Sequence, residues 1–200
     1  APRIAVNVSA LQLRQRSFGD DVIAAVGGTD SGVDLESPES LLMEAPGQAK
    51  DALEKCRQFG TSISIDDFGT GYSSLSYLKR FSLDTLKIDR SFVNDITTNA
   101  DDRAITGAIV ALARSLALSV VAEGVETLAQ SELLQALGCS IMQGYFYGKP
   151  MPAKEFEGLL RCGLPTGIPK AVRDRIAIPT INSSPAHLRP APRKPASPIS

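Results

Sequence analysis

Short runs of β-branched and apolar residues alternate with longer stretches of helical periodicity along the first 161 residues. The short runs predict six strands, at residues 4–8, 33–36, 62–66, 85–89, 119–123 and 139–143. The longer stretches predict helices at residues 11–26, 48–59, 73–79, 101–117, 127–137 and 153–160. Each predicted strand is thus followed by a predicted helix.

Repeated strand–helix units predict an α/β fold with parallel strands, either an open doubly wound sheet or a barrel. The predicted strands end on polar residues, namely Asn7, Glu36, Asp66 with Asp67, Lys87 with Asp89, Glu123 and Gln143. Polar groups at every strand end favour a barrel, whose strands all point at one mouth, over an open sheet with one switch point. We therefore predict a TIM-like (β/α)8 barrel. It is expected to be incomplete, because about six units are two short of eight, and the missing units are expected before residue 1.

The composition changes near Cys162. Eight of the thirteen prolines follow it, among Arg, Lys and Ser, and so does the single histidine, His187. Such a segment buries too little apolar surface to offset its ordering entropy. We expect a folded domain at residues 1–161 and a disordered Pro-rich tail at residues 162–200.

Charge and cysteine content narrow the functional classes. A formal net charge of -1 gives no field of one sign, so binding to duplex nucleic acid is not expected. Cys56, Cys139 and Cys162 are far apart and lack Cys-x-x-Cys spacing, which indicates reduced thiols and a cytoplasmic protein. No apolar run approaches the roughly 20 residues of a membrane span. The start, without Met or a signal sequence, indicates a fragment or processed chain.

The strand ends combine oxygen ligands with one amine. Carboxylates at Glu36, Asp66, Asp67 and Glu123, with the Asn7 amide, suit Mg²⁺ or Mn²⁺. A bridging carboxylate would allow two ions roughly 3.5–4 Å apart and hydrolysis of a phosphate ester. Alternatively, the paired aspartates only cap the following turn while Lys87 pairs with them. Acids on three strands favour the metal site over this turn-capping role. A metal site of this kind also fits an unrelated Mg²⁺-dependent barrel enzyme of the enolase type.

The stretch DDFGTGYSSLSYLKRFSLDTLKIDRSFV, residues 66–93, resembles the signature of the EAL family of cyclic di-GMP phosphodiesterases. Three further segments are similar to family motifs: NVSALQL at 7–13, VVAEGVET at 120–127 and MQGYFYGKPMP at 142–152. The resemblance covers nearly all of residues 3–161. An enolase-type enzyme does not account for residues 66–93.

The resemblance implies metal-dependent hydrolysis of cyclic di-GMP to linear pGpG in bacterial signalling, with two Mg²⁺ or Mn²⁺ ions. It also implies a homodimer formed through the loop after Asp67. The implied roles are metal ligation by Asn7, Glu36, Asp66, Asp67 and Glu123, water activation by Lys87 and Glu123, a nucleotide contact by Gln143, and support from Glu39, Asp89 and Glu126.

Two departures from the family qualify this expectation. The Glu-Ala-Leu segment is absent, so we expect this fragment alone to be inactive and poorly folded. The family's Glu-x-Thr-Glu-Ser is ESPES here, and Pro38 fixes φ and removes an N–H beside Glu36. Two functions stay open: the parent protein is the enzyme, or a degenerate module binds cyclic di-GMP or a protein partner. The first of these is favoured because the chain keeps the family's site residues, namely Asp66, Asp67, Lys87, Glu123 and Gln143.

Overall fold

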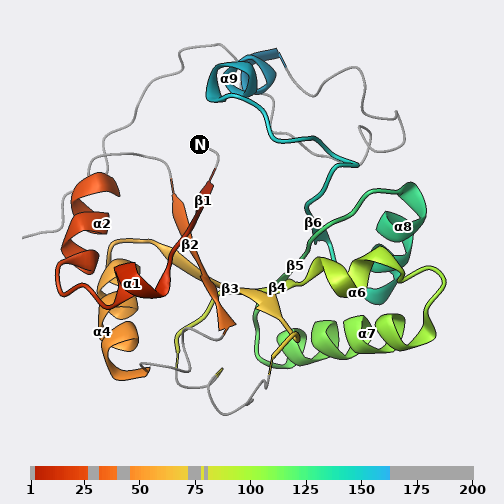
Figure 1. The fold of residues 1–200 in the computed structure, drawn as a ribbon, viewed down its shortest axis with the longest axis horizontal. Coiled ribbons are helices and arrows are strands. Elements are labelled where there is room, and N and C mark those ends of the chain that lie inside the picture. The colour runs from red at the N-terminus through yellow and green to blue at the C-terminus, as the bar shows by residue number, and fades with distance from the viewer. Residues whose placement is uncertain (1–2, 27–31, 40–45, 72–77, 79–80, 163–200) are drawn as a thin grey trace, which may run out of the picture. The chain divides into compact units, whose positions relative to one another are not determined.

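The computed structural model describes residues 3–26, 32–39, 46–71, 78 and 81–162 (Figure 1). The chain forms two compact units, Ala1–Lys149 and Pro150–Ser200. The second unit contains helix α9, Ala153–Cys162. The predicted tail lies outside the described residues apart from Cys162, so the expected domain boundary stays a prediction. No helix among these ranges combines the length and apolar character needed to cross a bilayer.

The first unit is built on one six-stranded sheet in which every neighbouring pair is parallel. The strands follow one another in chain order: β1 (Ile4–Asn7), β2 (Val33–Pro38), β3 (Ser62–Phe68), β4 (Thr85–Ile88), β5 (Ser119–Ala122) and β6 (Ile141–Met142). This order excludes a doubly wound sheet, whose strand order reverses at a switch point. The curved sheet with helices is a half-barrel of the TIM type (Figure 1), which confirms the predicted fold class.

The helices of this unit lie in the connections between strands (Figure 1). They are α1 (Ala10–Leu13), α2 (Phe18–Val26), α4 (Pro46–Gln58), α6 (Arg90–Asn94), α7 (Ala100–Ser115) and α8 (Leu128–Leu137). Thr127 caps α8 in a capping box with Gln130, and Gly138 ends that helix in the left-handed conformation. The predicted helix at 73–79 lies outside the described residues apart from Leu78.

Two sequence predictions about helices were wrong. The single helix expected at 11–26 is two helices, because Leu13 and Phe18 are both buried although five residues apart, a spacing that one helix would turn to different faces. The helix α6 was not predicted at all. It is short, and its start is encoded by Asp89, whose side chain accepts from the Ser91 backbone N–H at 2.9 Å.

The core lies between the sheet and the helices. Alternate strand residues such as Ile63, Ile65, Leu86 and Ile88 are buried, and they belong to one cluster with residues of α4, α7 and α8. Because side chains alternate along a strand, this leaves Lys87 on the opposite face of the sheet from Leu86 and Ile88. The same alternation separates Glu36 from its neighbour Leu35. The apolar core therefore sets which polar side chains face the inside of the half-barrel.

One buried glutamine joins the segments that follow β4 and β5. Gln130 is 6% exposed. Its Oε1 accepts from the backbone N–H groups of Glu126 at 2.8 Å and Thr127 at 2.9 Å. Its Nε2 donates to the carbonyl oxygens of Val93 at 3.2 Å and Asn94 at 2.9 Å. The end of α6 and the start of α8 are thereby tied together.

Replacing this glutamine by leucine should destabilise the protein although the size changes little. The Gln130→Leu substitution leaves buried carbonyl and N–H groups without their partners, which costs about 1 to 3 kcal/mol. Urea denaturation followed by circular dichroism measures this loss, with Gln58→Leu, at the exposed end of α4, as the control. Equal midpoints for the two variants would contradict the expectation.

Candidate catalytic site

Lys87 is the centre of the site. It is on β4 and is 3% exposed. Its Nζ lies 2.6 Å from Glu36 Oε2, 3.1 Å from Asp66 Oδ1 and 2.5 Å from Glu123 Oε1. One ammonium therefore holds carboxylates from β2, β3 and the end of β5 in a single cluster. Lys87 pairs with Asp66, as the alternative interpretation expected, but the lysine is buried and also contacts Glu36 and Glu123.

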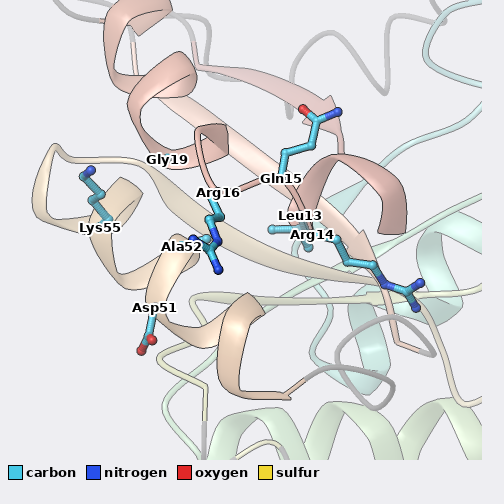
Figure 2. Close-up of a pocket in the computed structure, with 8 residues that line it drawn as sticks. All are labelled: Leu13, Arg14, Gln15, Arg16, Gly19, Asp51, Ala52 and Lys55. Atoms are coloured by element: carbon cyan, nitrogen blue, oxygen red, sulfur yellow. The ribbon is translucent and has the colours of Figure 1, made fainter.

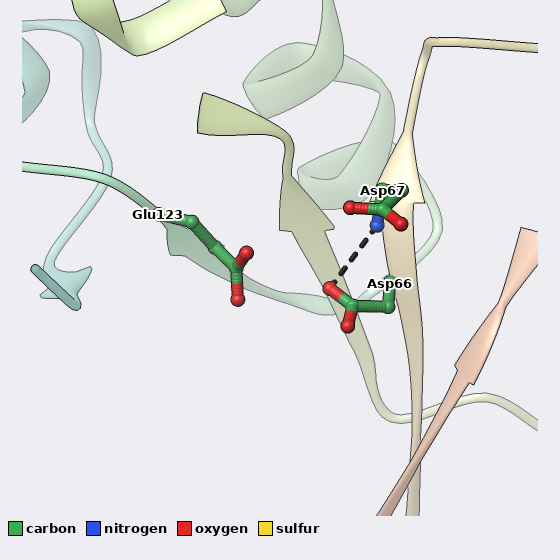
Figure 3. Close-up of side chains that lie close together, drawn as sticks. All are labelled: Asp66, Asp67 and Glu123. Atoms are coloured by element: carbon green, nitrogen blue, oxygen red, sulfur yellow. Dashed lines mark hydrogen bonds between the residues drawn. The ribbon is translucent and has the colours of Figure 1, made fainter. Parts of the chain in front are cut away.

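A local irregularity lets two consecutive aspartates serve one site. In a regular strand Asp66 and Asp67 would point to opposite faces. The register between β3 and β4 shifts between Ile65 and Phe68, and Asp67 adopts φ 54°, a left-handed conformation that few residues other than glycine take. Figure 3 shows the carboxylates of Asp66, Asp67 and Glu123 grouped together, with Asp67 N donating to Asp66 Oδ1 at 3.1 Å. The bulge thus turns both aspartates to the same place.

The charges in the cluster shift several pKa values. Burial raises the pKa of Glu123; the Lys87 ammonium opposes this rise, and the negative charge of Asp66 adds to it. Burial also raises the pKa of Asp67, together with the charge of Asp66 and a hydrogen bond with Asp89. Burial alone would lower the pKa of Lys87, but hydrogen bonds to Glu123 and Glu36 raise it above its ordinary value. Lys87 is thus a cation throughout the physiological range.

The donor set fits a divalent metal ion. Asp66, Asp67 and Glu123 each offer a carboxylate oxygen, and these oxygens lie within 4.8 Å of one another. Oxygen ligands of this kind bind Mg²⁺ and Mn²⁺. Because Asp66 and Glu123 also contact Lys87, the carboxylates are grouped in advance of any ion. A divalent ion can therefore be held by residues that are already in place.

The structure places the other predicted site residues at the same ends of the strands. Asn7 ends β1 in register with Glu36, and its side chain is exposed. Gly71 lies at the start of the loop after β3. A Cβ on Gly71 would be 3.9 Å from the Glu39 carboxylate. Both positions are compatible with the roles implied for Asn7 and Glu39.

Of three further predicted residues, Asp89 contacts the cluster, and for Gln143 and Glu126 the structure gives their place in the fold and their exposure. Asp89 is brought to Asp67 by the hydrogen bond named above. Gln143 follows β6 with an exposed side chain, and the Glu126 side chain is also exposed. The Glu126 backbone N–H donates to Gln130 Oε1. The sequence analysis missed the structural role of Gln130. The capping-box sequence TLAQ, residues 127–130, could have indicated it.

Pro38 does not turn Glu36 away from the site. It is the last residue of β2 and lies in register with Asp66. Two residues earlier, Glu36 still reaches Lys87 at 2.6 Å. The loop after Asp67, to which the predicted dimer contact was assigned, lies outside the described residues from residue 72 to 77, so the dimer stays a prediction.

A separate hollow of about 260 Å³ lies among α1, α2 and α4 (Figure 2). Its lining carries Arg14 and Arg16 from the turn between α1 and α2, and Asp51 and Lys55 from α4. The two arginines do not converge: in Figure 2 Arg16 extends across α4, whereas Arg14 extends away from it. Lys55 is already paired with Asp20 at 2.5 Å. This hollow therefore has no arrangement comparable to the carboxylates around Lys87.

The chain is similar to known proteins over most of its length. The family model for the EAL domain matches residues 1–150. A curated relative, the bifunctional diguanylate cyclase/cyclic di-GMP phosphodiesterase MucR of Pseudomonas aeruginosa, is 50% identical over 155 residues, which are 76% of this chain and 23% of that protein. The chain spans about a fifth of the length of the curated relatives that it matches.

Solved structures agree with the sequence match. The PaMucR phosphodiesterase in complex with c-di-GMP has a TM-score of 0.72 at 48% identity, over 77% of this chain and 64% of that chain. The Klebsiella pneumoniae BlrP1 complex with manganese and cy-diGMP at pH 9.0 has a TM-score of 0.66 at 33% identity, over 74% of this chain and 39% of that chain. The half-barrel described above is thus shared with proteins of known structure.

Proposed function

The chain belongs to the EAL domain family, and from this premise we propose that the protein carrying it hydrolyses one phosphodiester bond of cyclic di-GMP to give linear pGpG. One observation carries the proposal: a buried lysine holds carboxylates from three strands in one cluster. A module that only binds a partner has no need of such a cluster. The names of MucR and PaMucR support the substrate, because they state cyclic di-GMP for those proteins.

We assign a metal-binding role to the carboxylates. Asp66, Asp67 and Glu123 would hold a divalent ion. Asn7 and Glu36 would add oxygen ligands from β1 and β2. When bound, Mg²⁺ or Mn²⁺ supplies Lewis-acid activation of a phosphate oxygen and of water. The BlrP1 complex with manganese supports the choice of a divalent ion.

Side chains of this chain would accept the proton of the attacking water and offset the negative charge on the phosphate. Glu123 accepts a proton from the attacking water, for which its raised pKa suits it. Lys87 orients that water and offsets negative charge that develops on the phosphate. The water oxygen forms a bond to phosphorus as its proton passes to Glu123, and the bond between phosphorus and the 3′ oxygen breaks. The 3′ oxygen takes up a proton from solvent, and Glu123 returns its proton to solvent. Gln143, at the end of β6, would contact the nucleotide.

The proposal is tested by incubating cyclic di-GMP with the full-length gene product in Mn²⁺ or Mg²⁺ and separating the nucleotides by chromatography. We expect pGpG to form, and we expect a chelator in excess of the metal to stop its formation. Cyclic di-GMP binding without pGpG would instead support a degenerate binding module. If neither cyclic di-GMP binding nor pGpG formation is observed, the proposed substrate is wrong.

The 200-residue chain alone, assayed in parallel, is expected to be inactive. All four residues of the edge strand β1 are exposed, including Ile4 at 56% and Val6 at 44%. Unpaired strand edges of this kind invite association with other chains. Turnover by the isolated chain together with a cooperative unfolding transition would show this expectation to be wrong.

A further inference from the structure

The loops that follow β5 and β6 pack backbone against backbone beside Glu123. Gln143 N donates to Ala122 O at 2.8 Å, which continues the pairing of the two strands. Beyond it, Val125 N donates to Gln143 O at 3.0 Å, and Phe146 N donates to Val125 O at 3.0 Å. Val125 is fully buried. The course of the β5 loop is therefore set by the β6 loop.

Gly144 allows the two loops to come this close. A Cβ at this position would lie 2.2 Å from Val125 O and 2.3 Å from Val125 N. Real Cβ atoms essentially never approach heavy atoms to less than 3.0 Å. The atoms in the way belong to the backbone, so no rotation of a side chain can make room. Any side chain at position 144 must move one loop away from the other.

The β5 loop is held on its other side by α6. Gly124 has φ 69°, and a Cβ there would lie 2.5 Å from Arg90 Cβ. Glu123 directly precedes Gly124, and its Oε1 lies 2.5 Å from Lys87 Nζ. Contacts on both sides thus fix the backbone from which Glu123 reaches the cluster.

We propose that Gly144 is a positioning residue for Glu123: its missing side chain lets the β6 loop hold the β5 loop where Glu123 meets Lys87 and Asp66. The inference rests on the proposed hydrolysis of cyclic di-GMP. Gly144 itself touches no reacting group. Its effect is transmitted through the Val125 backbone, two residues from Glu123.

The test compares Gly144→Ala with Gly148→Ala in the full-length protein. Gly148 lies in the same loop, and a Cβ there meets nothing within 4 Å. We expect Gly144→Ala to lower kcat for pGpG formation by about 100-fold, because a displacement of about 1 Å in a catalytic group can have an effect of this size. KM should change much less, and Mn²⁺ affinity measured by electron paramagnetic resonance should fall. Gly148→Ala should match the unsubstituted protein in all three quantities.

Each outcome decides the inference. A folded Gly144→Ala protein with unchanged kcat and Mn²⁺ affinity would overturn it, and so would equal losses in the two variants. If the unsubstituted protein makes no pGpG, the proposed function fails, while the Mn²⁺ affinity still decides the role of Gly144. If Gly144→Ala does not fold, as judged by circular dichroism, the inference is overturned in favour of a purely structural role for Gly144.

Discussion

Asp66→Asn is expected to lower kcat/KM for cyclic di-GMP by more than about 100-fold while the protein stays folded. The substitution keeps the size and one oxygen of the side chain but removes the charge shared with Lys87 and with any bound ion. Loss of residues that merely support metal ligands lowers metal affinity or activity 10- to 100-fold, so loss of a ligand's charge should exceed that range. A 100-fold change corresponds to about 2.7 kcal/mol of transition-state stabilisation.

The measurement is a Mn²⁺ titration of pGpG formation beside a binding titration of Mn²⁺ alone. Both the maximum rate and the metal affinity should fall in Asp66→Asn. The exposed Asp101→Asn, at the start of α7, is the matched control and should keep both values. If Asp66→Asn kept its metal affinity and lost only rate, Asp66 would not be a metal ligand.

Lys87→Met is expected to abolish hydrolysis and to destabilise the metal-free protein. It removes the one ammonium that contacts Glu36, Asp66 and Glu123, and it leaves three carboxylates close together. Breaking a buried ion pair by removing one partner costs about 3 to 5 kcal/mol. A divalent ion supplies positive charge to the same carboxylates. Mn²⁺ should therefore raise the thermal midpoint of Lys87→Met more than that of the unsubstituted protein.

These two readouts separate structure from chemistry. With saturating Mn²⁺, Lys87→Met should regain most of its stability but no hydrolysis, because the ion replaces the charge of the lysine and not the contact with the attacking water that we propose for it. Lys50→Met, at an exposed position on α4, is the control and should change neither quantity. Recovery of hydrolysis on adding Mn²⁺ would show that Lys87 only holds the carboxylates together.

Much of the candidate site could be predicted from the sequence alone. The alternation of strand and helix patterns indicated parallel βα units, because crossover connections impose that arrangement. Polar residues at the strand ends then indicated a shared mouth, and the motif at residues 66–93 indicated the family. These features are local in the chain, so they can be read without knowledge of the fold.

Other features depended on contacts between distant segments. The burial of both Leu13 and Phe18, the register shift at Asp67 and the close approach of Gly144 to Val125 each involve segments that are far apart in the sequence. The order and pattern of residues thus determined the six strands, most of the helices and the acids at the strand ends, including Glu36, Asp66 and Glu123. Only the tertiary structure decided that Lys87 meets Glu36, Asp66 and Glu123 at once, because the register between neighbouring parallel strands sets those distances and no local periodicity encodes it.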